Sequence, residues 1–278
     1  MSGATHRAAV AERAARAGGV VARDSFRESL DIETKAHRND LVTAADRDAQ
    51  RQAITTVRQE FPDARFVGEE ESRPVGAEDV PLLEAVPETG DAWVIDPIDG
   101  TGNYVRGNPR WATVVAAVTD GDPVGVATYL PAHEELYAAG PDSVTRNGDP
   151  VQVSDRTDPE TFVVGIVGRW SIHPPARPAN LVESTLDRFA NVRRAGSMQA
   201  TLALVAAGAF DAAIMPDPPE PWDSIAGVHL VQQAGGTATN LAGEDWHHDD
   251  DGLLVSNGHC HDRLVAAAEE ALADPAER

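Results

Sequence analysis

Acidic side chains whose spacing could support chemistry are concentrated in the stretch WVIDPIDGTGN, residues 93–103. Its apolar start is typical of a β-strand. The strand should end and turn at Asp96 and Pro97, because Pro97 cannot donate a hydrogen bond to a sheet. Residues three apart in a flat strand face opposite sides. Asp96 and Asp99 can therefore approach each other only if the backbone bends.

Two such carboxylates favour a bound cation. Held close together they repel each other, and a cation between them removes the repulsion. Hard carboxylate oxygens prefer Mg²⁺, which keeps several waters and takes further ligands from substrate phosphate. Gly100 allows the backbone to approach a bound group, and successive N–H groups in such a turn can bind an anion. The alternative is an Asp-rich surface turn, since turns favour Asp and Gly.

Other acidic residues occur in similar settings. Glu69 and Glu70 follow a predicted strand, Asp46 lies in the first turn of a predicted helix, and Asp223 stands at the start of another. Each also has a structural explanation. Asp223 could be an N-cap, Asp46 could form a capping box with Thr43, and Glu69 could belong to an exposed loop.

Considered together, these motifs have specific residue types and a specific order along the chain. They are DLVTAAD at residues 40–46, GEE at 68–70, DPIDGTGN at 96–103 and WDSIAG at 222–227, followed by AGG at 234–236. In this order they resemble the inositol monophosphatase family, Mg²⁺-dependent and lithium-sensitive phosphomonoesterases that include archaeal enzymes also hydrolysing fructose 1,6-bisphosphate. The resemblance extends from about Thr5 to Ala273. It implies an α/β fold, the layered α-β-α-β-α sandwich.

The resemblance also implies two to three Mg²⁺ ions and their ligands. Glu69 and Asp96, with the carbonyl of Ile98, would bind a first ion. Asp96, Asp99 and Asp223 would bind a second. A third, weaker ion would depend on Glu69. Two metals about 3.5–4 Å apart suit monoester hydrolysis, which needs an activated water, a neutralised phosphoryl group and a stabilised leaving oxygen.

Catalytic and phosphate-binding roles follow in the same way. Thr101, linked to Asp46, would orient the attacking water, with Glu70 near the third metal. Backbone N–H groups of Gly100 and Thr101 would hold the phosphate. Lys35 lies five residues before the first motif, where the family often has a lysine near the site.

Residues on the substrate side depart from the family pattern. In animal members an acidic residue seven positions before the Trp-Asp aspartate contacts the inositol ring, but here that position is Pro216, and Asp217 lies one place away. Arg194, Gly196 and Ser197 join a predicted strand to a helix, where an anion or sugar could bind. Arg194 could meet a second phosphate, as fructose bisphosphate requires, or could simply pair with a surface acid.

The elements that must position these residues alternate along the chain. We expect a helix from about Thr5 to Ser29, loosened at Gly18 and Gly19, and a second helix ending at Glu60. Three antiparallel strands should follow the central motif, at residues 111–119, 124–130 and 135–139. The second half then alternates strands (162–167, 191–194, 211–215, 253–256) with helices (180–189, 197–207, 224–233, 262–273).

Two halves are predicted within one compact unit. Residues 1–150 carry most of the metal ligands and the phosphate loop around Gly100 and Thr101. Residues 151–278 carry Asp223 and the residues predicted to contact the substrate. A chain of 278 residues is long enough for such a core.

Composition excludes several classes of protein. The net charge of −22 argues against nucleic acid as a partner. Lys35 is the only lysine, and acid-rich, lysine-poor chains are typical of organisms with a salty cytoplasm. No apolar run is long enough to span a membrane, and no signal peptide is visible, so we expect a cytoplasmic protein. The single Cys260 excludes an internal disulfide.

The sequence therefore predicts a Mg²⁺-dependent phosphatase acting on a small sugar or cyclitol phosphate. A bisphosphate nucleotidase of the same superfamily is the enzymatic alternative, and a non-catalytic regulatory protein on the same fold is the other. The resemblance also implies a homodimer.

Overall fold

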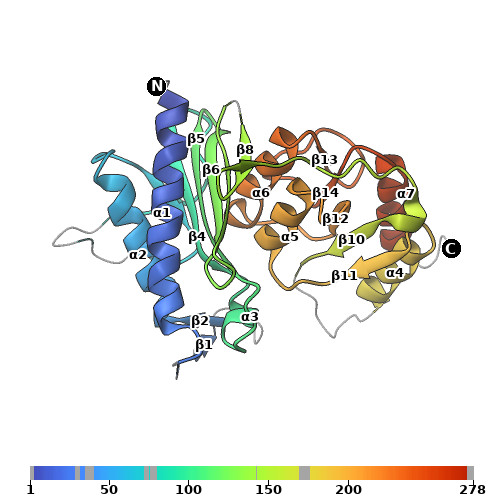
Figure 1. Ribbon diagram of the computed structural model, residues 1–278, viewed down its shortest axis with the longest axis horizontal. Helices are drawn as coiled ribbons and strands as arrows, with labels where there is room; N and C mark the ends of the chain where they lie inside the picture. The colour runs from blue at the N-terminus through green and yellow to red at the C-terminus, as the bar shows by residue number, and fades with distance from the viewer. Residues whose placement is uncertain are drawn as a thin grey trace.

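The computed structural model describes residues 3–28, 32–34, 41–71, 75, 80–141, 143–168 and 176–273. Within this part of the chain, two large sheets and the helices around them stack in five layers (Figure 1). The helices are α1 (Gly3–Ser25), α2 (Ala44–Arg58), α3 (Thr101–Tyr104), α4 (Ala176–Leu186), α5 (Met198–Ala206), α6 (Pro221–Gln233) and α7 (His261–Leu272). The predicted α-β-α-β-α sandwich is confirmed.

The larger sheet has seven described strands and follows chain order. It consists of β3 (Phe66–Gly68), β4 (Asp91–Asp99), β5 (Ala112–Thr119), β6 (Asp122–Leu130), β7 (Glu135–Ala139), β8 (Val144–Arg146) and β9 (Asp149–Pro150). Strand β3 runs parallel to β4, and the remaining neighbours are antiparallel. The three predicted antiparallel strands correspond to β5, β6 and β7. A short hairpin of β1 (Ile32–Thr34) and β2 (Leu41–Thr43) precedes this sheet in the chain.

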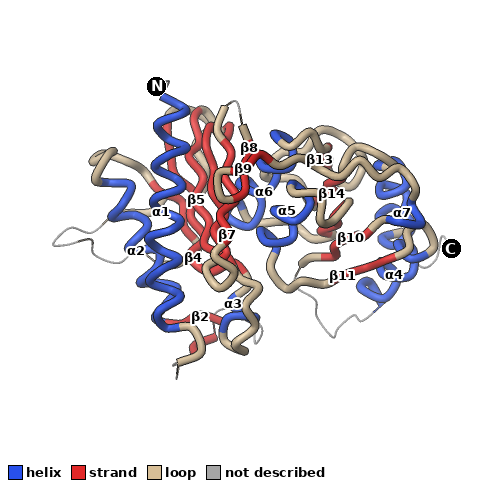
Figure 2. Tube along the Cα trace, viewed as in Figure 1, coloured by secondary structure: helices blue, strands red, loops and turns tan. Residues whose placement is uncertain are grey.

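The smaller sheet belongs to the second half of the chain. Its order is β11 (Asn191–Arg193), β10 (Val163–Ile166), β12 (Ala212–Met215), β14 (Leu253–Ser256) and β13 (Thr237–Thr239). Helices α5 and α6 lie between the two sheets, α1 and α2 cover the outer face of the larger sheet, and α4 and α7 cover the outer face of the smaller one (Figure 2). The alternation predicted for this half is confirmed, although β13 was not predicted.

Strand β4 lies at the centre of this packing. Trp93 and Ile95 belong to the core beneath α1 and α2, whereas Ala92 and Val94 belong to the core shared with α5 and α6. All four side chains are buried. A strand covered on both faces is expected to be apolar throughout, which explains the uninterrupted run before Asp96.

Helix α1 runs without a break through Gly18 and Gly19, so the predicted loosening at this pair is wrong. Both glycines lie where neighbouring elements come close. A Cβ on Gly18 would be 2.9 Å from the carbonyl oxygen of Ala49 in α2, and one on Gly19 would be 2.6 Å from the Tyr129 ring in β6. The glycines therefore permit close helix packing, and their cost to the helix is about 1 kcal/mol each.

Two predicted element boundaries also differ from the structure, the end of β4 and the start of α6. Strand β4 continues past Pro97 to Asp99, because its pairing with β5 resumes at Asp99 and Ala112. Helix α6 begins at Pro221, with Glu220 as its N-cap residue, so Asp223 lies inside the first turn and is not the N-cap. Proline is well suited to the first helical position, because its missing N–H would have no intrahelical partner there.

None of the described helices is both long enough and apolar enough to cross a bilayer.

Candidate active site

A cleft of about 650 Å³ lies where the end of β4 meets the starts of α5 and α6. Both halves of the chain contribute to its walls. Eleven of the residues proposed from sequence line it: Glu69, Asp96, Ile98, Asp99, Gly100, Thr101, Arg194, Gly196, Ser197, Asp217 and Asp223. The structure thus brings together side chains that are more than 150 positions apart in the sequence.

A β-bulge places two of the carboxylates on the same side of β4. Asp96 pairs with Val114 and Asp99 with Ala112, so three steps along β4 match two steps along β5. One extra residue in a strand reverses the alternation of side chains beyond it. Asp96 and Asp99, which would face opposite ways in a regular strand, therefore both face the cleft. The carbonyl oxygen of Pro97 within the bulge accepts a hydrogen bond of 2.7 Å from Thr113 Oγ1.

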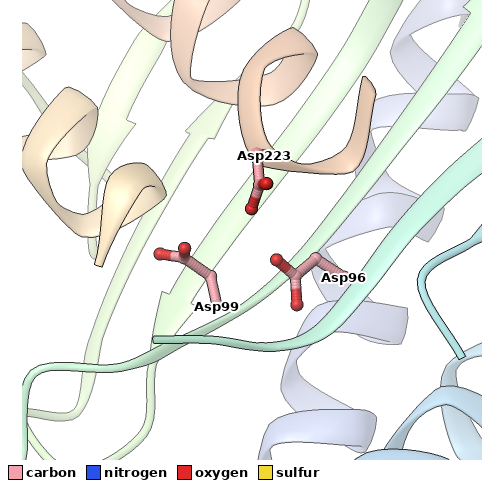
Figure 3. Close-up of side chains that lie close together, drawn as sticks. All are labelled: Asp96, Asp99 and Asp223. Atoms are coloured by element: carbon pink, nitrogen blue, oxygen red, sulfur yellow. The ribbon is translucent and has the colours of Figure 1, made fainter. Parts of the chain in front are cut away.

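Asp223 completes a cluster of three carboxylates. Oxygen atoms of Asp96, Asp99 and Asp223 lie within 4.8 Å of one another, and the side chains point toward a common centre (Figure 3). Asp223 reaches this centre from the first turn of α6. Asp96 and Asp99 are buried, so the alternative of an exposed Asp-rich turn is wrong.

The carboxylate of Asp96 has an unusual environment. It is 1% exposed, and neither of its oxygens has a hydrogen-bond donor among the residues that the structure describes. Burial raises the pKa of Asp96 well above its ordinary value, and the charges of Glu69, Asp99 and Asp223 raise this pKa further. A buried carboxylate without donors, surrounded by other carboxylates, is stabilised by a cation. The residues present thus fit a divalent metal ion.

Asp99 has a second set of partners in the other half of the chain. Its carboxylate accepts a hydrogen bond from the Ser197 hydroxyl, one of 3.0 Å from the Met198 N–H and one of 2.9 Å from the Gln199 N–H. Asp99 therefore caps the N-terminus of α5 across the cleft. Burial raises the pKa of Asp99 to about 6, although the hydrogen bonds from Ser197 and from the α5 backbone act in the opposite direction.

The loop that carries Glu69 is fixed by a residue of α2. The side-chain amide of Gln50 donates to the carbonyl oxygen of Glu70 at 2.8 Å and accepts from its N–H at 3.0 Å. A Cβ on Gly68 would lie 2.7 Å from Gln50 Oε1. The N–H of Glu69 bonds to the carbonyl oxygen of Ile95, so the loop follows the edge of β4. Glu69 lines the cleft, whereas Glu70 is buried behind it.

Thr101 and Asp46 lie side by side at the Gly100–Thr101 turn. Thr101 Oγ1 donates to the carbonyl oxygen of Ile98 at 3.0 Å and lies 3.4 Å from Asp46 Oδ1. The other oxygen of Asp46 accepts from the N–H and the hydroxyl of Thr43, at 2.8 and 2.7 Å. The predicted capping box at the start of α2 is confirmed. Asp46 thus serves the helix and faces Thr101 at the same time.

The proposed substrate-side residues form the opposite wall. Ser197 is the N-cap of α5 and donates to Asp99, and Gly196 precedes it with φ +78°. Arg194 is exposed and donates to the carbonyl oxygen of Gly168 at 3.1 Å. Asp217 borders the same cleft. Lys35 lies outside the described residues.

Sequence reasoning missed three residues of this region. Gln50 holds the Glu69 loop, Asn103 joins the loop predicted to bind phosphate to the segment before α5, and Arg106 lines the cleft. Gln50 follows Asp46 by four residues on the buried face of α2, a spacing that could have indicated its position. Asn103 belongs to the DPIDGTGN motif, but nothing in the motif identifies its partner.

Comparison with known proteins gives a consistent result. The model of the inositol monophosphatase family matches residues 4–273. A fructose-1,6-bisphosphatase/inositol-1-monophosphatase of Thermotoga maritima is 31% identical over 243 residues, which cover 87% of each chain. The Nus factor SuhB of Pseudomonas aeruginosa is 30% identical over 270 residues, covering 95% of this chain and 96% of that protein.

Solved structures show the same similarity. The inositol monophosphatase of Thermotoga maritima superimposes with a TM-score of 0.83 at 28% identity, covering 94% of this chain and 95% of that one. An inositol monophosphatase/NADP phosphatase in complex with Mg²⁺ and phosphate gives a TM-score of 0.75 at 25% identity, covering 91% and 90%.

Proposed function

Since this chain belongs to the inositol monophosphatase family and is a phosphoric monoester hydrolase, we propose that it hydrolyses a small sugar or cyclitol phosphate with bound Mg²⁺. One observation carries the proposal. Asp96, Asp99 and Asp223 converge beside the Gly100–Thr101 turn, and no residue in the described part of the chain donates a hydrogen bond to the Asp96 carboxylate. A cluster of hard oxygen ligands beside a turn with free N–H groups can hold a divalent cation and a phosphate group side by side.

We propose Glu69, Asp96, Asp99, Asp223 and the carbonyl oxygen of Ile98 as the metal ligands, for two to three ions. Hard oxygen donors of this kind suit Mg²⁺. When bound, the ions would lower the pKa of the attacking water and neutralise the phosphoryl group and the leaving oxygen. The Mg²⁺ complex of the similar inositol monophosphatase/NADP phosphatase supports this choice of ion.

The protein's own groups would orient the reaction. Helix α3 begins at Thr101 after Gly100, which has φ +88° and no side chain to cap the helix. The first N–H groups of a helix have no intrahelical partner, so those of Gly100 and Thr101 are proposed to hold the phosphate oxygens. Glycine is required at this turn, because a Cβ there would lie 3.0 Å from the carbonyl oxygen of Gly196.

Thr101 is proposed to position the attacking water. Its hydroxyl hydrogen has two acceptors within the protein, the carbonyl oxygen of Ile98 and Asp46 Oδ1. With the hydrogen directed to either acceptor, the lone pairs of Oγ1 can accept a hydrogen bond from the water. Asp46, as one of these acceptors, would fix the direction of the Thr101 hydroxyl. Glu70, the chain neighbour of Glu69, is proposed to act near the third metal ion.

For the substrate, we propose that Gly196, Ser197, Arg194, Asp217 and Lys35 contact the sugar or cyclitol ring and its further substituents. The name of the Thermotoga relative supports inositol 1-phosphate and fructose 1,6-bisphosphate as first candidates. The exposed guanidinium of Arg194 at the cleft suits a second phosphate.

The test is a substrate panel. Phosphate release is measured from inositol 1-phosphate, fructose 1,6-bisphosphate and adenosine 3′,5′-bisphosphate with Mg²⁺ and high KCl, followed by a lithium titration. Turnover of the first two, dependent on Mg²⁺ and inhibited by Li⁺, is expected. Preference for the adenosine bisphosphate would instead favour a bisphosphate nucleotidase, which the NADP phosphatase activity named for the similar structure supports. No turnover of any of the three would refute the proposal.

The remaining alternative is a regulatory protein, which the similarity to the Nus factor SuhB supports. It would bind a partner without Mg²⁺ and without turnover. We further propose a homodimer, by resemblance to the family alone, and sedimentation at high KCl would test it.

A further inference from the structure

We propose that Asn103 is a positioning residue that sets metal affinity by holding the N-terminus of α5 against the phosphate loop. The inference deepens the proposed function and rests on it. Asn103 lies in α3, two residues after Thr101. Its Nδ2 donates to the carbonyl oxygen of Arg110 at 2.7 Å and to that of Ala195 at 2.8 Å. One amide group therefore joins the two halves of the chain.

The amide of Asn103 is fully engaged. Its oxygen accepts a hydrogen bond of 3.2 Å from Asn108 Nδ2, while both donor positions face backbone carbonyls. An amide with two donors and an acceptor fits this environment, whereas a carboxylate of the same shape does not. Aspartate would place an oxygen against the carbonyls of Arg110 and Ala195, leaving two acceptors without donors and adding repulsion.

Glycines on both sides make the contact close. Gly196 has φ +78°, and a Cβ there would be 2.9 Å from both Nδ2 and Oδ1 of Asn103. Gly100 has φ +88°, and a Cβ there would be 3.0 Å from the carbonyl oxygen of Gly196 and from Ser197 Cβ. Both residues adopt a backbone conformation that favours glycine. The phosphate loop and the segment before α5 therefore meet without intervening side chains.

This contact reaches the metal cluster through Asp99. The segment that Asn103 holds ends at Ser197, the N-cap of α5. The Ser197 hydroxyl and the N–H groups of Met198 and Gln199 orient the Asp99 carboxylate, whose oxygen lies within 4.8 Å of those of Asp96 and Asp223. A displacement of the α5 N-terminus therefore turns or moves Asp99. Groups that orient a ligand in this way typically change metal affinity by about 10–100-fold when they are mutated.

The test uses Asn103→Asp and measures Mn²⁺ binding without substrate, by electron paramagnetic resonance of the free ion. Mn²⁺ prefers the same oxygen ligands as Mg²⁺. We expect the dissociation constant to rise by about 10-fold or more. In the phosphatase assay, the Mg²⁺ concentration for half-maximal activity should rise, and kcat should recover substantially at saturating Mg²⁺.

The matched control is Asn147→Asp. Asn147 also bridges backbone groups, donating to the carbonyl oxygen of Glu134 and accepting from the N–H of Leu136, but it lies in the β8–β9 turn and outside the cleft. Its Mn²⁺ affinity should stay within about 2-fold of the unaltered protein, because no metal ligand depends on this turn. Equal loss of Mn²⁺ affinity in both variants would make the effect one of general stability and overturn the inference.

A double-mutant cycle covers the case in which Asn103→Asp does not fold. Asn103→Ala removes the two donated hydrogen bonds and the one accepted from Asn108. Gly196→Ala adds a clash with Asn103 to the backbone strain at φ +78°, and the double variant removes the clash but keeps the strain. The effects on Mn²⁺ affinity should be non-additive, since the two side chains would act through one contact. Additive effects, or a raised KM with unchanged Mn²⁺ affinity, would overturn the inference. If the unaltered protein binds no Mn²⁺, the proposed function fails and this inference with it.

Discussion

Among the described residues, no group donates a hydrogen bond to the buried carboxyl group of Asp96. Without metal, Asp96 and its carboxylate neighbours repel each other, as the raised pKa of Asp96 indicates. Such a site is typical of a group kept for function at the expense of stability. Removal of the Asp96 carboxylate should therefore weaken metal binding and stabilise the metal-free protein.

Asp96→Asn should abolish Mn²⁺ binding and lower kcat/KM by about 1,000-fold or more, because two proposed metal positions share this carboxylate. In the presence of a chelator, the same variant should unfold at an equal or higher temperature than the unaltered protein. Phosphate release and thermal denaturation measure the two effects. Asp187→Asn, at an exposed residue just after α4, is the control. A fully active Asp96→Asn variant would contradict the site assignment.

Thr101→Ala should separate metal binding from catalysis. The hydroxyl is proposed to orient the attacking water and lies 3.4 Å from Asp46, so we expect kcat to fall by about 100- to 10,000-fold. Mn²⁺ affinity should change little, because only the carbonyl of Ile98 contacts this hydroxyl among the proposed ligands. Thr101→Ser should retain most of the activity. Comparable rates for the Ala and Ser variants would rule out a role for the hydroxyl.

At the level of elements, the close packing of α1 against β6 predicts that replacing Gly19 of α1 by alanine lowers the stability of the protein. Gly19→Ala gains about 1 kcal/mol of helix propensity, but its Cβ would be 2.6 Å from the Tyr129 ring and 2.9 Å from Pro131. Overpacking typically costs about 1–3 kcal/mol, so the variant should be less stable. Gly3→Ala, where no atom lies within 4 Å of the added Cβ, should be neutral. Urea unfolding of both variants measures the difference, and a stabilised Gly19→Ala would show that the packing is looser than described.

Helix α6 contributes a titratable group to the interior. His229 is buried, its Nε2 makes no hydrogen bond to any described residue, and burial lowers its pKa to about 4. Below the ordinary value of 6.5 the unfolded chain binds a proton that the folded protein does not bind. The free energy of unfolding should therefore fall between pH 6.5 and 4, by about 3 kcal/mol at most from this residue.

His229→Gln removes this titration. The variant should show a flatter dependence of unfolding free energy on pH over the same range, whatever its stability at neutral pH. Chemical denaturation at pH 4, 5, 6 and 7 measures the slopes. Identical slopes for the variant and the unaltered protein would contradict the buried, neutral state of His229.

At the level of the whole molecule, the net charge of −22 is the dominant feature. Repulsion among surface carboxylates destabilises the compact state and is screened as the Debye length falls from about 10 Å at 0.1 M salt to about 3 Å at 1 M. We predict that the melting temperature rises with KCl over this range, by roughly 2–4 °C for each kcal/mol gained. NaCl at equal ionic strength should give a similar rise, because screening depends on ionic strength and not on the particular cation. An unchanged melting temperature in KCl would refute the proposed adaptation to salt.

We also propose that residues 1–150 and 151–278 act as one unit. The proposed metal ligands come from β4 and its neighbouring loop in one half and from α6 in the other, and Asp99 caps α5 across the boundary. Neither half contains a complete site. Separation of the halves would also leave the first N–H groups of α5 without the carboxylate that caps them.

The sequence by itself determined the chemistry and most of the elements. The side chains able to bind a hard cation are few and lie in recognisable motifs, and local rules such as the capping box at Thr43 operate within a few residues. Strands β5 to β7 and the alternation of the second half were predicted because periodicity is also local. The family resemblance rests on the same short motifs.

Only the tertiary structure decided how those residues meet. The bulge that turns Asp96 and Asp99 to one side depends on the register with β5, which no local pattern encodes. The partners of Asp99 in α5 and the Ala195 carbonyl that Asn103 contacts lie more than 90 residues away, and the glycines of α1 are explained by neighbours in α2 and β6. Contacts of this kind arise from packing between distant segments. The sequence therefore identifies the groups that do the chemistry, and the fold determines their geometry.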